Sequence, residues 1–217
     1  ANSCRFNGSN DSLVRTVGTA GNRKTFTIST WIKKSKDAVQ QIIGQATANG
    51  YFRIIFKTGT TNKLYVYGNN DAENNSFEVY TNRLFNDSAA WMHIVVRMDT
   101  TQGTASDRLR IYINGIQETS FTGAVYPSQD WSTHFHTTQP HNIGASASGG
   151  DYFNGYMSEI ISIDGSSLDA TSFGEFDEDS GIWKPIDGLA DDLTFGTNGF
   201  YLDFKDSSAL GDDVSGN

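Results

Sequence analysis

The sequence predicts an all-β chain: a two-sheet antiparallel sandwich followed by an irregular, acidic C-terminal extension. Three observations carry this prediction. Short runs rich in β-branched and aromatic residues alternate polar and apolar positions, turn-forming residues recur about every ten residues, and no amphipathic helical pattern exceeds two turns. Since a period of two leaves one face of each strand apolar, two packed sheets are the simplest way to bury those faces.

The pattern is clearest in two runs and the turn that follows them. Residues 91–98 and 108–113 are joined by a polar loop that contains glycine, which indicates antiparallel neighbouring strands. Asn114 and Gly115 favour the positive φ angles of a type I′ turn, so residues 116–119 are expected to fold back as a third strand.

Alternation in these runs predicts which side chains enter the core. We assign to the buried faces of the two strands Trp91, Ile94, Val96, Leu109, Ile111 and Ile113. Trp91 and Ile111 are expected to face the opposite sheet from adjacent strands. His93 lies within an apolar strand and is expected to be a packed histidine rather than a functional one.

The other strands follow from the same signals. In residues 24–33, Phe26 and Trp31 fall on opposite faces, so the second face of this strand is not simply solvent-exposed. Asparagine and glycine turns separate further expected strands, which are 4–6, 13–15, 40–44, 51–56, 63–67, 77–80, 142–144 and 153–163. The single cysteine, Cys4, is expected to be a small buried apolar residue of the first strand.

Charge divides the chain into two parts. Residues 1–168, the expected sandwich, carry a net charge of +1, whereas residues 169–217 carry −10. Without a basic stripe the chain is not expected to bind nucleic acid. No run approaches the ~20 apolar residues of a membrane span, so membrane insertion is not expected either.

The acidic extension holds few apolar residues and is not expected to fold alone. Asp169 is expected to cap one helical turn over residues 168–173. Tyr201 to Phe204 should add a strand to a sheet edge, and Trp183 should pack on the exterior of the sandwich.

Several segments together resemble a known family. Residues 26–33, 91–96, 109–115, 143–144 and 153–160 are similar, in order and approximate spacing, to strands of laminin G-like domains with the concanavalin A-like lectin/glucanase fold. The resemblance implies a concanavalin A-like jelly roll.

The extension resembles a subset of these domains. Residues 170–175 and 195–204 are similar to the corresponding parts of virion proteins of tailed bacteriophages. This resemblance implies a tail fibre, tailspike or capsid-surface protein on the virion surface, with a host glycan or neighbouring virion subunits as partner; a homo-oligomer stays open. We expect the chain to be the ordered part of a longer polypeptide.

An enzyme is not expected, although the fold also hosts glucanases. Retaining members place E-x-D-x-x-E on one strand, so that its carboxylates share a face. The nearest match, residues 175–180, ends in Ser180 where the second glutamate should be and lies in the acidic extension. No Ser-His-Asp arrangement is readable from the sequence.

Two polar loops are the predicted ligand-binding segments, because recognition residues concentrate on loops. Exposed aromatic rings beside amide and carboxylate groups suit sugars. The predicted ligand-binding residues are Asn69, Asn70 and Asp71 in the first loop, and Tyr126, Trp131, His134 and His136 in residues 122–140. The alternative for Trp131 is that it caps an open end of the sandwich.

No cofactor is required, but the family resemblance implies a calcium site at the sandwich rim. Asp71 and, before the closing strand, Asp151 are the predicted ligands. The alternatives are solvated loop carboxylates and, for His134 and His136, a shared cation.

We therefore expect a non-catalytic virion surface module that is structural, glycan-recognising or both. The alternative functions are an extracellular lectin or adhesion module of a cell and, third, a glycoside hydrolase.

Overall fold

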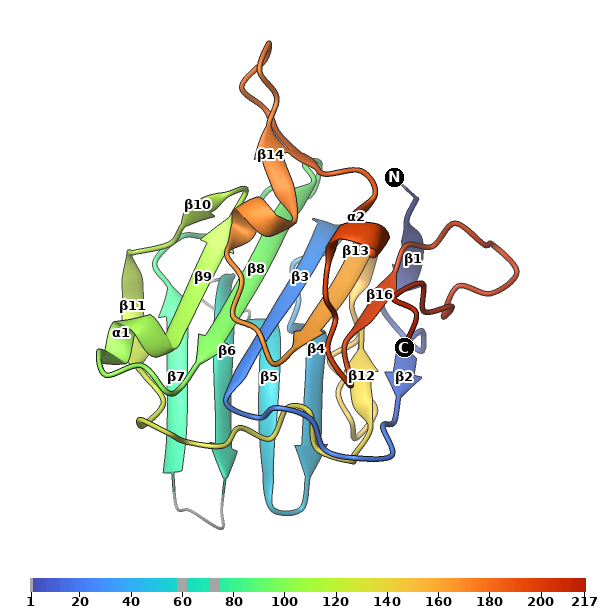
Figure 1. The fold of residues 1–217 in the computed structure, drawn as a ribbon. Coiled ribbons are helices and arrows are strands. Elements are labelled where there is room, and N and C mark those ends of the chain that lie inside the picture. The colour runs from blue at the N-terminus through green and yellow to red at the C-terminus, as the bar shows by residue number, and fades with distance from the viewer. Residues whose placement is uncertain (1, 58–61, 71–74) are drawn as a thin grey trace.

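The computed structural model of the chain describes residues 2–57, 62–70 and 75–217, and within them it is a two-layer β-sandwich (Figure 1). Sheet A contains β1 (Cys4–Asn7), β13 (Asn154–Asp164), β3 (Thr25–Lys34), β8 (Met92–Asp99), β9 (Leu109–Ile113) and β10 (Ile116–Gln117) in that order, with β16 (Phe200–Leu202) also paired to β13. Sheet B contains β11 (Phe121–Val125), β7 (Asn75–Thr81), β6 (Lys63–Asn70), β5 (Gly50–Lys57), β4 (Gln40–Thr47), β12 (His141–Ile143) and β2 (Leu13–Arg15).

The remaining elements are short. They are α1 (Ala105–Arg108), the 3₁₀ turn η2 (Ala170–Ser172), α2 (Leu189–Asp192) and a hairpin of β14 (Gly174–Phe176) with β15 (Trp183–Pro185). Strand pairing is antiparallel throughout the described sheets. The predicted all-β jelly-roll class is confirmed. No helix of the described residues is long and apolar enough to cross a membrane.

The main core lies between the two sheets. Phe26 of β3 and Phe52 of β5 come from opposite sheets, and their ring centroids lie 5.4 Å apart. Phe135, from the loop that closes one end of the sandwich, packs against both at 5.1 and 5.0 Å. Ile111 is 1% exposed, as predicted.

Trp91 does not enter this core. Its side chain is 39% exposed, so the prediction that it faces the opposite sheet is wrong. Position 91 has the opposite parity to Ile94 and Val96, and β8 begins only at Met92. Strict alternation therefore turns Trp91 away from the side chains with which it was grouped.

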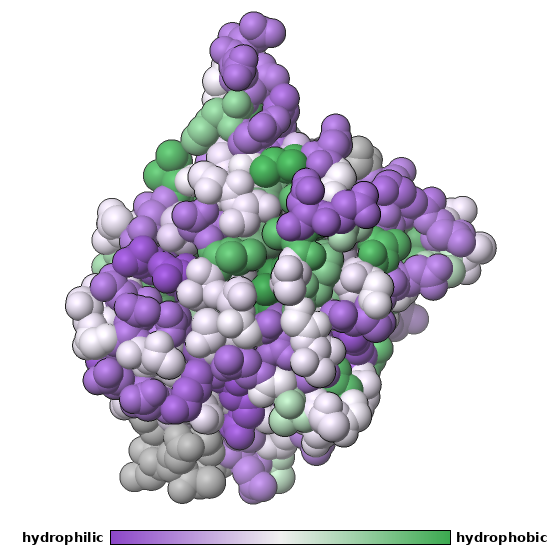
Figure 2. Space-filling model, in the orientation of Figure 1, coloured by the Kyte–Doolittle hydropathy of each residue, from purple (hydrophilic) through white to green (hydrophobic). Residues whose placement is uncertain are grey.

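A second apolar cluster covers the outer face of sheet A. Its members from the sheet are Val95, Tyr112, Ile161 and Ile163, and from the C-terminal segment Ala170, Phe173, Trp183, Leu189, Phe195 and Tyr201. Figure 1 shows this segment, in orange and red, in front of β8, β3 and β13. On the same face in Figure 2, hydrophobic surface gathers near the middle and is bordered by hydrophilic residues.

His93 anchors the extension to sheet A. Trp183 Nε1 donates a hydrogen bond of 3.0 Å to His93 Nδ1, and His93 Nε2 lies 2.8 Å from Ser29 Oγ. Burial lowers the pKa of His93 to about 3, so the imidazole is neutral and can accept from the indole. His93 is the packed histidine that the sequence predicted.

Candidate functional site

The outer face of sheet B carries a group of tyrosine and charged side chains. On β5, β6 and β7 the residues Phe52, Ile54, Leu64, Val66, Phe77 and Val79 are buried in the core. The alternate positions therefore point away from the core. They form what we call the tyrosine face: Tyr51, Arg53, Lys57, Tyr65, Tyr67, Glu78 and Tyr80, all of them partly exposed.

Strand register brings the four rings of the tyrosine face together in two pairs. Tyr65 and Tyr80 are paired across β6 and β7, and their rings stack at 4.5 Å with an interplanar angle of 6°. Tyr51 and Tyr67 meet edge to face at 5.4 Å. Tyr80 lies against Gly123 of β11, where a Cβ would come within 2.3 Å of the ring, so a larger residue there would have to displace the ring.

Cations hold these rings in place. Lys57 Nζ lies 4.3 Å from the Tyr65 ring centroid and 4.0 Å from that of Tyr67, and it also pairs with Glu78 at 3.2 Å. The Arg53 guanidinium lies 5.6 Å from the centroid of Tyr51. Cation–π contacts of this kind restrict both partners, so the tyrosine face is an ordered platform.

Two phenol groups of this platform, those of Tyr51 and Tyr67, are held in the protonated form. Burial is the largest cause, and it raises the pKa of each above the ordinary value. Both hydroxyls can therefore donate and accept hydrogen bonds at neutral pH. The face thus combines apolar ring surface with hydroxyl, guanidinium and ammonium groups, which is the chemistry that a polyhydroxylated ring needs.

The residues predicted to bind a ligand from the two loops lie at one end of the sandwich, and several of them are largely enclosed by other residues. Trp131 is 3% exposed, and its ring packs at 5.1 Å against Phe77 in the main core. A ring buried in this way leaves neither face open to a sugar, so the structure corrects the stacking role and shows the alternative, a cap on the sandwich. Tyr126 is partly buried against the same core.

Other predicted residues have varied positions. Asn69 lies beside the tyrosine face, where its Oδ1 accepts a 3.1 Å hydrogen bond from the backbone N–H of Tyr51. His134 is 8% exposed and packs close to Gly50 of the β4–β5 hairpin, so it presents little surface to a ligand. Asp71 lies outside the described residues, as does the side chain of Asn70.

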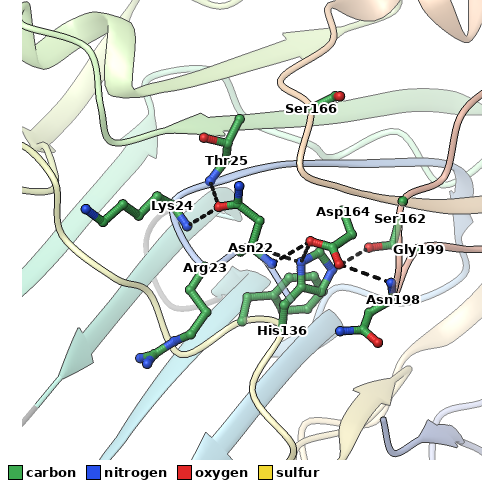
Figure 3. A network of polar contacts seen from close by, with 12 residues as sticks. Asn22, Arg23, Lys24, Thr25, His136, Ser162, Asp164, Ser166, Asn198 and Gly199 are labelled. Atoms are coloured by element: carbon green, nitrogen blue, oxygen red, sulfur yellow. Dashed lines mark hydrogen bonds and ion pairs between the residues drawn. The ribbon is translucent and has the colours of Figure 1, made fainter. Parts of the chain in front are cut away.

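His136 is buried in a polar network (Figure 3). Its Nε2 lies 3.1 Å from Ser162 Oγ and its Nδ1 lies 3.4 Å from Asp164 Oδ1. Asp164 also accepts hydrogen bonds from the backbone N–H groups of Asn22 and Asn198. Burial alone would raise the pKa of Asp164, but the hydrogen bonds from His136 and these backbone groups outweigh it and lower the pKa.

The order Ser162–His136–Asp164 is that of a catalytic triad, which the sequence did not reveal. Ser162, however, is 0% exposed and His136 is 1% exposed. A nucleophile must reach its substrate, and this hydroxyl cannot. The network instead connects four segments: Asn22 before β3, His136 of the loop that closes one end of the sandwich, Ser162 and Asp164 of β13, and Asn198 of the extension. Its role in this fold is therefore structural.

Of the two predicted calcium ligands, the structure describes only Asp151. Asp151 Oδ2 lies 3.5 Å from Arg53 Nη1, next to the tyrosine face. Within residues 2–57, 62–70 and 75–217, no group of three or more His, Cys, Asp or Glu side chains is placed to hold a metal ion. His134 and His136 accordingly form no such group there.

Comparison with known proteins places this architecture in a family. Residues 7–163 match the family described as the concanavalin A-like lectin/glucanases superfamily. The chain belongs to this family. No curated protein sequence matches it.

Solved structures with the same fold come from very different proteins. Mouse laminin α1 chain, domains LG4-5, is 17% identical, with a TM-score of 0.54 over 78% of this chain and 43% of that one. The binding domain of botulinum neurotoxin DC in complex with SialylT is 16% identical, with a TM-score of 0.53 over 77% and 40%. The enzymatically active domain of bacteriophage CBA120 tailspike protein 2 is 13% identical, with a TM-score of 0.51 over 75% and 25%.

These similarities establish the fold and no more. The chain spans less than half of each of the three matched structures. The family is one of carbohydrate-binding folds, while the particular ligand has to be argued from the residues of this chain.

Sequence reasoning missed the tyrosine face, although the signal was present. In the expected strand 63–67, two tyrosines, Tyr65 and Tyr67, alternate with Leu64 and Val66. Two aromatic residues on the outward face of a central strand indicate a surface that contacts a ligand or a partner. The loops were favoured because recognition residues are more often found there.

Proposed function

We propose that this chain is a non-catalytic carbohydrate-recognition module that binds glycans on the tyrosine face of sheet B. The observation that carries the proposal is the set of four tyrosines at alternate positions of β5, β6 and β7, ordered by Lys57 and Arg53 and not covered by the extension. Family membership supports it, since the fold is of the lectin/glucanase type.

The chemistry of the face suits an extended glycan. Tyrosine rings offer apolar surface to the C–H groups of pyranose rings, and the phenol hydroxyls can pair with sugar hydroxyls. Arg53 and Lys57 add donors for hydroxyl or carboxylate oxygens. Because each cation already has an acidic neighbour, Asp151 or Glu78, the face is not a general anion-binding surface.

Two features support the absence of catalysis. Ser162 of the triad-like network is sealed from solvent. The carboxylates of Glu175 and Asp177 are both held by Lys184, at 3.3 and 3.2 Å. Hydrogen bonds from Ser180 and Lys184 lower the pKa of Asp177 to about 2, whereas a general acid needs a raised pKa.

The setting that we propose is the surface of a phage particle, in a tail fibre, tailspike or capsid-surface protein. Its support is the resemblance of residues 170–175 and 195–204 to virion proteins, together with a fold shared with a phage tailspike domain. A cell-surface adhesion module remains the alternative, with the same fold shared by laminin and toxin domains.

A glycan array tests the proposal. The intact chain should bind one class of oligosaccharide, and Tyr67→Ala should weaken that binding by about 1–3 kcal/mol, the scale of aromatic stacking on flat rings. Val14→Ala, an exposed change on β2 at the far edge of the same sheet, is the control and should bind normally. Arrays with calcium and with EDTA show whether the ion contributes.

The outcome that contradicts the proposal is equally definite. If no glycan binds, or if Tyr67→Ala binds as the parent does, the tyrosine face is not the recognition surface. Release of reducing sugar from a bound glycan, or labelling of Ser162 by a fluorophosphonate, would contradict the non-catalytic part.

A further inference from the structure

A pocket on the outer side of sheet A is a second candidate site. Its volume is about 280 Å³, and it is lined by Asn2, Ser3, Trp31, Trp91, Ser158 and Pro185. These residues come from the N-terminal segment, from β3, β13 and the start of β8, and from β15 of the extension. The extension, which folds back over sheet A, contributes one wall of the pocket through Pro185.

Trp31 is held as a rigid wall of this pocket. Its ring stacks on that of His93 at 4.8 Å and 19°, and His93 stacks in turn on Trp183 at 6.0 Å and 24°. The hydrogen bonds of His93 to Ser29 and Trp183 fix the middle ring of this stack. One face of the Trp31 ring thus packs against His93. Trp31 is only partly buried and also lines the pocket.

Trp91 supplies a second, more exposed aromatic surface. Its side chain is 39% exposed and belongs to neither apolar cluster, so it takes no part in either core. Its ring lies 6.4 Å from Tyr156, over which Arg5 is placed at 5.3 Å. An exposed tryptophan beside a partly open one is unusual for a surface without a ligand.

The polar lining is neutral. Ser158 Oγ donates a hydrogen bond to the backbone oxygen of Asn2, and the side chains of Asn2 and Ser3 are exposed at the mouth. Among the described residues, those that line the pocket include no Lys, Arg, Asp or Glu. Apolar ring surface with hydroxyl and amide groups, and without charge, matches an uncharged sugar better than an anionic one.

We propose that this pocket is a second saccharide site, which takes a single neutral pyranose unit stacked on Trp31 and Trp91. Its volume lies just below the usual range of ligand pockets, which favours one ring over a chain of several. The site is on the outer side of sheet A, so the molecule has one glycan surface on each sheet and can engage two sugars at once. This proposal goes beyond the tyrosine face and does not depend on it.

The four tryptophans provide the test. In the intact chain with ¹⁵N-labelled tryptophan, the indole N–H signals are assigned by single substitutions and followed during titration with methyl glycosides of glucose, galactose, mannose and N-acetylglucosamine. At least one of these should shift the signals of Trp31 and Trp91 in a saturable way. Trp131, 3% exposed in the core, should not shift.

Variants separate this site from the tyrosine face. Trp91→Ala should weaken monosaccharide binding about tenfold or more while leaving the dispersion of the spectrum unchanged, because the side chain packs in neither cluster. Trp91→Phe should retain part of the binding. Tyr67→Ala, on the opposite sheet, should leave the Trp31 and Trp91 shifts intact.

Two results would overturn the inference. One is the absence of a saturable shift of Trp31 or Trp91 with every glycoside up to solubility limits. The other is unchanged affinity in Trp91→Ala. Loss of array binding in Tyr67→Ala with these shifts preserved would show that the two sites are separate.

Discussion

The two sheets of this sandwich have the same strand architecture, yet their outer faces differ. On sheet A the outward positions include Val95, Ile161 and Ile163, which are fully buried beneath residues 170–201. On β5, β6 and β7 of sheet B the outward positions are mainly tyrosines and charged residues that remain partly exposed, with Ile55 and Lys63 buried among them. Most of the outer face of sheet A is committed to packing, apart from the pocket at Trp31 and Trp91, whereas the tyrosine face of sheet B is free to contact a partner.

The difference shows how the acidic extension acts on the fold. Without it, both outer faces would have to meet solvent, and the apolar residues of sheet A would form an exposed patch of the kind that promotes association. With it, sheet A gains a second core, and sheet B keeps the surface suited to recognition. The following predictions test this division, from the largest expected effect to the smallest.

Deletion of residues 169–217 should have the largest effect. The truncated chain would expose Val95, Tyr112, Ile161 and Ile163 together, and it would free the edge of β13 that pairs with β16. We expect aggregation, measured by size-exclusion chromatography with light scattering. A soluble monomer with the parent melting temperature would show that the second cluster contributes nothing.

Trp183→Ala should destabilise the chain by about 3–5 kcal/mol, the usual cost of removing a large buried aromatic side chain. It also leaves His93 Nδ1 without its indole donor. Ile182→Ala, at a neighbouring position that is 66% exposed, should change the free energy of unfolding by no more than about 0.5 kcal/mol. Equal effects of the two changes in chemical denaturation would contradict the role of Trp183.

Stability should fall in mild acid, because two histidines are buried in neutral form. Burial lowers the pKa of His93 to about 3 and that of His141 to about 4, whereas both titrate near pH 6.5 in the unfolded chain. Between these values the unfolded state binds more protons. Their contribution is thus complete above pH 6.5 and is lost as the pH falls, at up to about 1.4 kcal/mol per pH unit for each histidine.

His93→Gln separates this effect from other titrations, such as that of the buried Glu159, whose pKa is raised mainly by burial. The variant should be less stable than the parent at pH 7 and should lose less stability between pH 6.5 and pH 4. Denaturation curves across this range measure both slopes. Parallel slopes would mean that His93 is not buried in neutral form.

The tyrosine face should be the least sensitive to substitution. Tyr65→Ala removes the stack on Tyr80 and the cation contact with Lys57, and we expect a loss of about 1 kcal/mol, the scale of an aromatic pair across strands. Thermal unfolding measures it. A loss as large as that for Trp183→Ala would show that the tyrosine face is a third packed cluster.

The strands were predictable because period-two alternation is a local property of the sequence. Ile111 could be assigned to the core directly, and Trp31 correctly indicated that the outer face of β3 is not simply exposed to solvent. The assignment of Trp91 to the core is wrong because it follows from the size of the side chain. Strict alternation places position 91 on the opposite face from Ile94 and Val96. Which residues cover a face is a property of the whole chain, and it required the structure.

The candidate site was less predictable for a related reason. Trp131, His134 and His136 lie in a segment without periodicity, and exposure in such a loop cannot be read from residue type. The stacking of Tyr65 on Tyr80 depends on the register between β6 and β7, which alternation alone does not give. The buried Ser162–His136–Asp164 group joins positions from separate elements and had no sequence signature.

β13 has a consequence for how the domain can be presented. Its first half pairs with β1 and its second half with β16, so the first and last strands share one edge of sheet A, and both ends of the chain lie on that side in Figure 1. A resin, biosensor tip or fusion partner attached at either end would therefore grip the domain by the same edge. Orientation on such a support should be nearly independent of which end is used, and the broad surface of β5–β7 would stay accessible to a soluble glycan in both cases.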